Sequence, residues 1–311
     1  MDALEGAIVA SLDKRGLEYL RRGELDCALR ELDHAIELNE ETSRLFNDRG
    51  LVYREKGDAE HAIADFDRAI YLDSSNVDAL NNRGTMYYSA REFDQAIAAY
   101  NRALALRAEC TTAYNNRGAA FDSRGDLARA LVNYSAAIQI KPDYTEAHYN
   151  RGIVYLRTGA FDSAAADLDE VIRLEPGSVN AYANRGIVFS RTGKYDLAIA
   201  SYSKAIKLKP GFAEAYYNRG MAYYKAGQRD RAIEDFGTAI GLKPDYVEAF
   251  NNRGSAYAAA GQFDRAIEDF NQALRLRPDY VKAQRNRARA VEQKQQRGSV
   301  ASSANGTLQH P

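Results

Sequence analysis

The tripeptide Asn-Arg-Gly recurs along this chain at a constant spacing of 34 residues, and this period constrains the fold more than any other feature. Looser copies occupy residues 14–16 and 48–50, and the copy that begins at Asn286 closes the series with alanine. A strict period of this length is typical of a stack of identical supersecondary units, not of a domain with one core. Any function must then reside on the surface that the stacking creates. The perfect copies begin at Asn82, Asn116, Asn150, Asn184, Asn218 and Asn252.

Side chains at fixed distances from each glycine indicate two helices per repeat. An aromatic residue stands three positions after the glycine and a bulky residue usually stands four before it, so all three share one helix face. Seven residues after the glycine, a second glycine appears in seven of eight units, where it suits the left-handed residue just past a helix end. Arg91 takes that place in the remaining unit, and we expect its turn to be strained or remodelled.

The second helix of each repeat carries an alanine, a bulky residue four positions later and a small residue three further on, as in Ala62, Phe66 and Ala69. Small residues allow two helices to approach closely, so we expect the glycine to face alanine while the aromatic rings fill the space beside it. From the fourth repeat on, a proline such as Pro142 ends each unit, because proline cannot continue a helix.

This pattern of bulky residue, Gly, Tyr, Ala, aromatic, Ala and Pro resembles the tetratricopeptide repeat. The resemblance implies an all-α fold, a right-handed α-solenoid (superhelix) of eight 34-residue helix-turn-helix repeats plus a C-terminal capping helix. One departure is regular: arginine precedes the glycine, where the family usually has leucine. This "NRG" variant resembles a subset of bacterial repeats.

The period divides the chain into a helical lead-in over residues 1–8, eight repeats over 9–280, a polar capping helix over 281–292 and a disordered tail over 293–311. The tail is rich in Gln, Ser, Gly and Asn with little apolar content, which favours disorder. A polar final helix is what the last repeat of a solenoid needs for solubility. The repeats are expected to start at residues 9, 43, 77, 111, 145, 179, 213 and 247.

The nine arginines that precede the glycines, from Arg15 to Arg287, share one register beside the packing face. A half-buried guanidinium needs a partner, and the candidate is a carboxylate of the second helix, fifteen residues after the glycine. Such pairs would lock each repeat to its own second helix or to the next first helix, and the sequence leaves both possibilities open. The competing hypothesis is a ladder that binds an acidic ligand. The predicted structural ion pairs comprise Arg49, Arg83, Arg151, Arg219, Arg253, Asp65, Asp167, Asp235 and Asp269.

The asparagines two residues before the glycines form a second row. Asparagine is a mediocre helix former, so a row of them in the middle of successive helices requires a reason. In some tetratricopeptide repeat proteins the matching asparagines line the concave surface and bond the backbone of a bound peptide, since an amide offers both donor and acceptor. Alternatively, each asparagine bonds a neighbouring first helix and only orders the stack. The candidate peptide-binding residues of this row are Asn82, Asn116, Asn150, Asn184, Asn218 and Asn252.

Positions on the first helices that face the expected groove become apolar in repeats five to seven. The residue after the glycine changes from Thr85 and Ala119 to isoleucine and methionine. Apolar side chains on a face that the fold does not bury indicate a binding surface, and the alternative is ordinary packing between adjacent first helices. The candidate groove has an apolar floor of Tyr149, Ile153, Leu156, Ile187, Tyr217, Met221 and Tyr224 and a basic margin of Arg157, Arg191 and Lys225.

Composition and motifs argue against several other classes of protein. The formal net charge of −1 creates no field that would attract nucleic acid or an anionic membrane, and no segment has the apolar run that a membrane span needs. Residues 1–10 lack the positive charge of a secretory signal. Cys27 and Cys110 stand in different repeats, which favours two free thiols in a reducing, cytoplasmic compartment.

No motif for catalysis or metal binding is recognisable in the sequence. The four histidines stand apart from other ligand residues at metal spacing, and there is no phosphate loop, nucleophile elbow or paired-cysteine motif. Nearly every residue already belongs to a helical pair, so we expect no enzyme, no cofactor and no small-molecule substrate.

The family resemblance implies a non-enzymatic scaffold that binds a peptide or protein segment in its concave groove. The clamp that related chaperone co-factors use for an acidic C-terminus needs Lys and Asn at particular groove sites. Here the candidates are Asn81, Thr85, Asn115 and Ala119, so the clamp is not supported. One alternative is a scaffold that self-associates by stacking its ends. A second is an RNA-binding helical repeat, which the mildly acidic exterior disfavours.

Overall fold

The computed structural model describes the backbone of residues 3–306 and the side chains of residues 4–297. Within these residues the chain forms seventeen α-helices and no strand, so the all-α fold expected from the sequence is confirmed. The chain divides into two compact units, residues 1–154 (unit 1) and residues 155–311 (unit 2).

The boundary between the units falls within one helix, α9 (Thr145–Thr158). The other helices of unit 1 are α1 (Ala3–Arg22), α2 (Leu25–Leu38), α3 (Ser43–Lys56), α4 (Ala59–Leu72), α5 (Val77–Ser89), α6 (Phe93–Leu106), α7 (Thr111–Ser123) and α8 (Leu127–Ile140). The other helices of unit 2 are α10 (Phe161–Leu174), α11 (Val179–Arg191), α12 (Tyr195–Leu208), α13 (Ala213–Lys225), α14 (Arg229–Leu242), α15 (Val247–Ala259), α16 (Phe263–Leu276) and α17 (Val281–Gly306).

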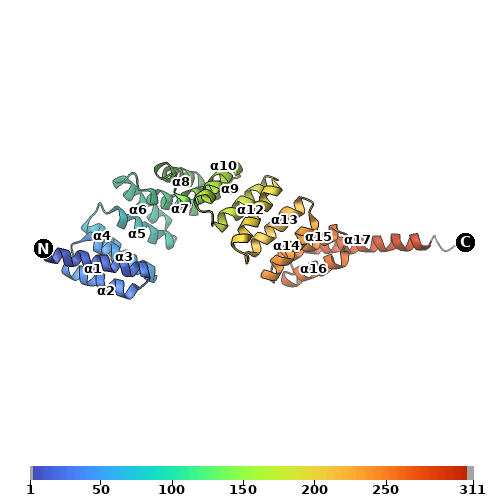
Figure 1. The fold of residues 1–311 in the computed structure, drawn as a ribbon, viewed down its shortest axis with the longest axis horizontal. Helices are drawn as coiled ribbons and strands as arrows, with labels where there is room; N and C mark the ends of the chain where they lie inside the picture. The colour runs from blue at the N-terminus through green and yellow to red at the C-terminus, as the bar shows by residue number, and fades with distance from the viewer. Residues whose placement is uncertain (1–2, 307–311) are drawn as a thin grey trace. The chain divides into compact units, whose positions relative to one another are not determined.

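Consecutive helices form hairpins, and the hairpins of each unit follow one another in chain order (Figure 1). In unit 1, α3 packs against α4 and α5 against α6, and in unit 2, α13 packs against α14 and α15 against α16. Second (even-numbered) helices also contact the next first (odd-numbered) helix, as α4 does with α5 and α12 with α13. The first helices from α3 to α15 begin at the residues where the 34-residue period starts repeats two to eight. The expected lead-in is continuous with α1, which begins at Ala3.

Repeat glycines within each unit, such as Gly84 and Gly186, lie where the two helices of a hairpin meet. A Cβ atom on Gly84 would lie 2.6 Å from Cε1 of Tyr100, and one on Gly186 would lie 2.5 Å from Cε1 of Tyr202. Both distances are far shorter than van der Waals contact, so an alanine there would displace a buried ring. The ring sixteen residues later therefore packs on the glycine itself, whereas we expected alanine to face it and the rings to lie beside it.

The turn between the helices of a hairpin uses a residue in the left-handed region. Gly57 has a φ of 77°, and Arg91 takes the same conformation with a φ of 62°. A side chain in this region costs about 1–2 kcal/mol because its Cβ crowds the following carbonyl. The turn at Arg91 thus keeps the shape of the other turns and carries the strain.

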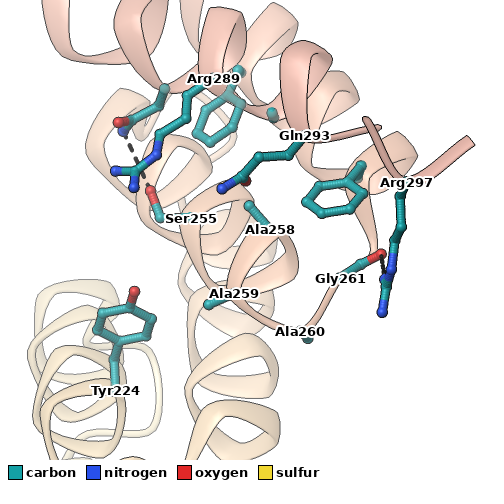
Figure 2. Close-up of a pocket in the computed structure, with 13 residues that line it drawn as sticks. Tyr224, Ser255, Ala258, Ala259, Ala260, Gly261, Arg289, Gln293 and Arg297 are labelled. Carbon is teal, nitrogen blue, oxygen red and sulfur yellow. Dashed lines mark hydrogen bonds between the residues drawn. The ribbon is translucent and has the colours of Figure 1, made fainter. Parts of the chain in front are cut away.

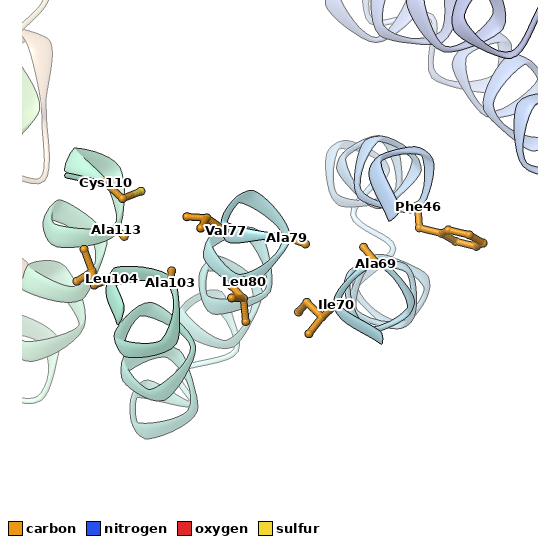
Figure 3. Packing of buried hydrophobic residues seen from close by; sticks show 10 residues of the cluster. All are labelled: Phe46, Ala69, Ile70, Val77, Ala79, Leu80, Ala103, Leu104, Cys110 and Ala113. Atoms are coloured by element: carbon orange, nitrogen blue, oxygen red, sulfur yellow. The ribbon is translucent and has the colours of Figure 1, made fainter. Parts of the chain in front are cut away.

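Small and aliphatic side chains fill the space between hairpins. In unit 1, Val77 and Leu80 of α5 lie between Leu104 of α6 and Ile70 of α4, and all four are buried (Figure 3). These contacts use one face of α5. Asn82 on the same helix is half-buried.

The last helix extends further than the sequence led us to expect. We expected a capping helix over residues 281–292 and a disordered tail after it, but α17 continues to Gly306. Residues 293–297 are good helix formers. Lys294 forms an ion pair with Asp264, and Nη1 of Arg297 donates to the carbonyl oxygen of Gly261 at 3.4 Å. These contacts stabilise the helix beyond residue 292. Residues 307–311 of the predicted tail lie outside the described residues.

Candidate peptide-binding site

The arginine row connects second helices. Arg49 on α3 donates from Nε and Nη2 to the two carboxylate oxygens of Asp65 on α4, at 2.8 and 2.7 Å. Its Nη1 donates to Asp33 on α2 at 2.7 Å. One guanidinium therefore holds residues sixteen positions after it and sixteen before it. The bidentate bond to Asp65 raises the pKa of Arg49 further above its ordinary value.

The same geometry recurs in unit 2. Arg219 binds Asp235 through Nε and Nη2, both at 2.8 Å, and reaches Ser203 with Nη1 at 2.9 Å. Arg253 binds Asp269 with the same two nitrogens, at 2.9 and 2.8 Å. Because the partners at sixteen residues on belong to the same hairpin, these pairs lock a repeat internally. The partner sixteen residues earlier, on the preceding second helix, is one that sequence reasoning missed.

Other members of the row differ because the residue sixteen positions on differs. Arg83 faces Ala99 there, so it pairs instead with Asp67 on the preceding second helix. Arg117 lies between two amides, with Nε 2.7 Å from Oδ1 of Asn133, and burial lowers its pKa. Arg151 in unit 1 donates to Ser135 at 2.9 Å, and Asp167 is buried on α10 of unit 2. The sequence had left open that these arginines pair with the next first helix. None of the partners named here lies on such a helix.

In unit 1 each asparagine of the row donates to another asparagine on the preceding first helix. Asn82 donates from Nδ2 to Oδ1 of Asn47 at 2.9 Å, and Asn116 donates in the same way to Asn81 at 3.2 Å. Asn150 donates to Asn115 at 3.2 Å. In each case the acceptor is the residue three before the glycine of the preceding repeat, so each amide joins two adjacent first helices. These contacts are the ones expected if each asparagine bonds a neighbouring first helix and orders the stack.

The row changes in unit 2, because the residue three before the glycine changes. Asn252 donates to the hydroxyl oxygen of Tyr217 at 2.8 Å, and Asn286 donates to Asn251 at 3.0 Å. Asn218 meets Ala183 at the corresponding position, and its side chain has no hydrogen bond to any residue that the structure describes. Asn184 lies half-buried on α11.

The residues of the expected apolar floor are half-buried. Tyr149 and Ile153 lie on α9 within unit 1, and the others lie in unit 2. Ile187 packs beside the buried core cluster of Phe189 and Tyr202. The three cations of the expected margin are exposed. The half-buried members in unit 2 are Leu156, Ile187, Tyr217, Met221 and Tyr224, and the exposed cations are Arg157, Arg191 and Lys225.

Tyr217 is held between neighbouring rings. Its ring centroid lies 4.9 Å from that of Tyr246 and 5.9 Å from that of Phe236. Burial raises the pKa of Tyr217 to about 12, so its hydroxyl stays protonated while it accepts the bond from Asn252. This ring is therefore part of the packed wall of unit 2.

Two cavities open along the first helices α13, α15 and α17 of unit 2. The smaller has a volume of about 330 Å3, with Met221 and Phe236 as apolar lining and Asn252 as polar lining. The larger has a volume of about 670 Å3 and continues toward the end of α15. Tyr224, Ser255 and Asn286 line both cavities, so the two form one continuous surface.

Figure 2 shows the larger cavity with Tyr224 on one side and Arg289 and Gln293 of α17 on the other, and with Ala258 and Ala259 between them. The cavity is thus bounded by an aromatic ring, a strip of alanine and a basic helix. A side chain of an extended ligand could lie against the ring. The Nδ2 donors of Asn252 and Asn286 are already bonded to Tyr217 and Asn251.

Four of the sequence-predicted groove residues line these cavities: Met221, Tyr224, Lys225 and Asn252. Leu156, Ile187 and Tyr217 line neither of the two. The residues that sequence reasoning missed lie on α15 and on α17, which we had treated only as a cap. The available signal was the register, because α17 places cations where the first helices from α5 to α15 have acidic or neutral residues. The missed residues are Asn251, Lys282, Arg285 and Arg289.

Within the described residues, no helix combines the length and the hydropathy that a membrane crossing requires. The same part of the chain holds no group of three or more His, Cys, Asp or Glu side chains that could bind a metal ion.

Comparison with known families identifies the repeat. The sequence matches the family described as "Tetratricopeptide repeat" at residues 77–110, 145–178, 217–280 and 251–303. It matches the family described as "TPR repeat" at residues 50–90, 123–159 and 190–227. The chain belongs to the tetratricopeptide repeat family. Members of this family bind peptides or proteins and are generally non-enzymatic, which supports a role as a protein-interaction scaffold. Its assignment to a bacterial "NRG" type stays a prediction.

Three solved structures share this tetratricopeptide repeat fold. YrrB, described as "a TPR protein with an unusual peptide-binding site", is 24% identical with a TM-score of 0.55, and the match covers 61% of this chain and 97% of YrrB. MamA is 29% identical with a TM-score of 0.53, covering 56% of this chain and 96% of MamA. A tetratricopeptide repeat protein from Parabacteroides merdae ATCC 43184 is 22% identical with a TM-score of 0.56, covering 80% and 98%. No curated protein matches the chain.

Proposed function

We propose that the protein binds an extended segment of a partner protein along α13, α15 and α17 of unit 2. The observation that carries this proposal is the pair of continuous cavities in which half-buried Met221 and Tyr224 lie beside the amides of Asn252 and Asn286. Apolar side chains beside a few well-placed polar groups are typical of binding sites.

Asn218 lines neither cavity, but on α13 it is the asparagine of the row whose amide is left for a ligand that lies along this helix. Asn82 and Asn116 use their donors on neighbouring first helices, whereas Asn218 has no such bond among the described residues. Its neighbour at the acceptor position is Ala183, which offers no side-chain hydrogen bond. A free amide can pair with the N–H and the C=O of an extended backbone whatever the side chains are.

The test is a pull-down that compares the wild type with Met221→Glu. Met221 lines the smaller cavity, so a charge there should expel an apolar side chain of the ligand and release the bound partners. Ala119→Glu is the matched control, since Ala119 holds the same register in unit 1. Partners that remain on Met221→Glu as firmly as on the wild type would contradict the proposal.

Self-association is the alternative function, and light scattering over a dilution series tests it. A monomer at all concentrations is expected for a receptor. A mass that rises with concentration would favour a scaffold built by end-to-end stacking.

We further propose a cytoplasmic location. Cys27 and Cys110 are both free and Cys110 is buried, which suits a reducing compartment. Localisation of a tagged protein in cell fractions checks this.

A further inference from the structure

The two cavities of unit 2 share one electrostatic property: their charged lining residues are all basic. Lys225, Lys282 and Arg285 line the smaller cavity, and Arg289 and Arg297 line the larger. No aspartate or glutamate lines either cavity. This is unexpected in a chain whose formal net charge is −1.

These cations are available to a ligand. Lys225, Lys282, Arg285 and Arg289 are exposed, and none of them has an ion pair with a carboxylate of the described residues. Two nearby cations that line neither cavity are already paired. Lys294 pairs with Asp264, and Arg277 pairs with Glu248 at 3.0 Å. The cations that line the cavities are therefore not neutralised by carboxylates of the described residues.

Three of the cations occupy one face of α17, because residues 282, 285 and 289 are spaced by three and four positions. The same registers in α15 hold Glu248, Asn251 and Ser255. The helix that closes the array thus replaces an acidic and two neutral residues by lysine and arginine. Solubility alone would be served by either sign of charge.

We infer that the segment bound by unit 2 is acidic and carries an aliphatic or aromatic side chain, its carboxylates lying against α17 and its apolar side chain in the cavity of Met221 and Phe236. This inference rests on the proposed function and deepens it by naming the chemistry of the partner. The apolar lining favours a peptide over a nucleic acid, because a backbone of phosphates would need the cations but not Met221. Exposed ion pairs are individually weak and are screened by salt, so specificity comes from several of them acting beside an apolar contact.

The experiment is a binding selection with the full chain on a library of random dodecapeptides sorted by net charge, at low and high ionic strength. We expect acidic peptides that contain Leu, Phe or Tyr to be enriched, and salt to weaken them. The double variant Lys282→Glu/Arg285→Glu should lower the affinity of an enriched peptide about tenfold or more. The variant Arg289→Glu provides an independent second measurement at the larger cavity.

The control is Lys204→Glu/Lys207→Glu on α12, which changes the net charge equally at exposed residues away from both cavities. Circular dichroism establishes that each variant is folded. The substituted lysines and arginines are exposed, so folding should be retained in these charge variants.

The outcomes distinguish a failure of the acidic-partner inference from a failure of the proposed peptide binding by unit 2. Enrichment without regard to charge, but lost on Met221→Glu, overturns the acidic partner and leaves the proposed function standing. Enrichment of no peptide over the Met221→Glu variant overturns both. Displacement of acidic peptides by single-stranded RNA at low concentration would assign the basic face to nucleic acid and overturn the inference.

Discussion

The two units build the same asparagine row and use it differently. In unit 1 the amides of Asn82 and Asn116 are joined to asparagines of the preceding first helix. In unit 2 the corresponding acceptor is a tyrosine for Asn252 and is missing for Asn218, whose neighbour is Ala183. The asparagine itself is the same in both units. Its availability to a ligand is therefore decided by a residue 35 positions earlier in the chain.

The units also differ in charge along this row. At the start of unit 1, Asp48 and Asp13 occupy the positions that Asn82 and Asn47 hold one repeat later. Burial and the nearby Asp13 carboxyl raise the pKa of Asp48 to about 6. Unit 2 has cations at its cavities in place of a carboxyl pair. The same register of the repeat thus holds a bonded amide pair at Asn82 and Asn47, a carboxyl with a raised pKa at Asp48, and an amide without a side-chain partner at Asn218.

The largest expected effect concerns the arginine partners. Asp235→Ala in unit 2 should lower the free energy of unfolding by about 3 kcal/mol, because Arg219 would keep only the hydroxyl of Ser203. Asp65→Ala in unit 1 should cost about half as much, because Arg49 retains Asp33. Urea unfolding followed by circular dichroism measures both. Equal losses in the two variants would contradict the difference between the units.

A smaller effect on stability is expected at Asp48, which lies beside the Asp13 carboxyl. Since the folded pKa of Asp48 is raised above the unfolded value of 3.8, folding is favoured below pH 4 and this contribution is lost as the pH rises through about 6. Asp48→Asn should therefore stabilise unit 1 by about 2 kcal/mol at neutral pH and hardly at all in acid. Urea unfolding on either side of pH 6 checks this, with the exposed Asp26→Asn as control. A gain that is the same in acid and at neutral pH would contradict the raised pKa of Asp48.

The third prediction tests the asparagine row directly. Asn116→Ala should lower the stability of unit 1 by about 1 kcal/mol, because it removes the bond to Asn81 and leaves an acceptor unpaired. Asn218→Ala should leave stability nearly unchanged and weaken binding of a peptide about tenfold. Unfolding and fluorescence anisotropy are measured on both variants. The reverse pattern would place the ligand in unit 1.

The smallest effect is expected at the strained turn. Arg91→Gly should stabilise unit 1 by about 0.5–1 kcal/mol, because glycine adopts a positive φ without strain. Gly125→Ala is the matched opposite change in the next hairpin, where φ is 82° and the surrounding space is open. That variant should lose about the same amount, and the two midpoints in urea should move in opposite directions.

The fold was predictable from the sequence because the period is strict and each register has one physical task. Gly84 and Tyr100 show this, since the spacing that repeats in the sequence is the contact itself. The arginine partners were predictable where a carboxylate lies sixteen residues on. The second partner, such as Asp33 for Arg49, was not, because it depends on how successive second helices lie side by side.

The candidate site was harder to predict than the fold. Met221 and Tyr224 are apolar residues in a groove register, so the sequence indicated them. Lys282 and Arg285 were missed because they belong to the helix after the last complete repeat, where comparison between repeats stops. The free amide of Asn218 could have been found by reading the residue 35 positions earlier.

The double grip of the arginines has a consequence for motion. Arg49 connects α2 to α4, and Arg117 connects α6 to α8. Each therefore couples the local stability of one hairpin to that of the next. Arg83 grips only α4, because Ala99 on α6 offers no acceptor. In a linear array, the loss of an interaction between neighbouring repeats allows the parts on either side to open by local unfolding independently. Amide hydrogens of α5 and α6 should therefore exchange with deuterium faster than those of α3 and α4. Unit 1 would then contain a position where coupling between neighbouring hairpins is weaker.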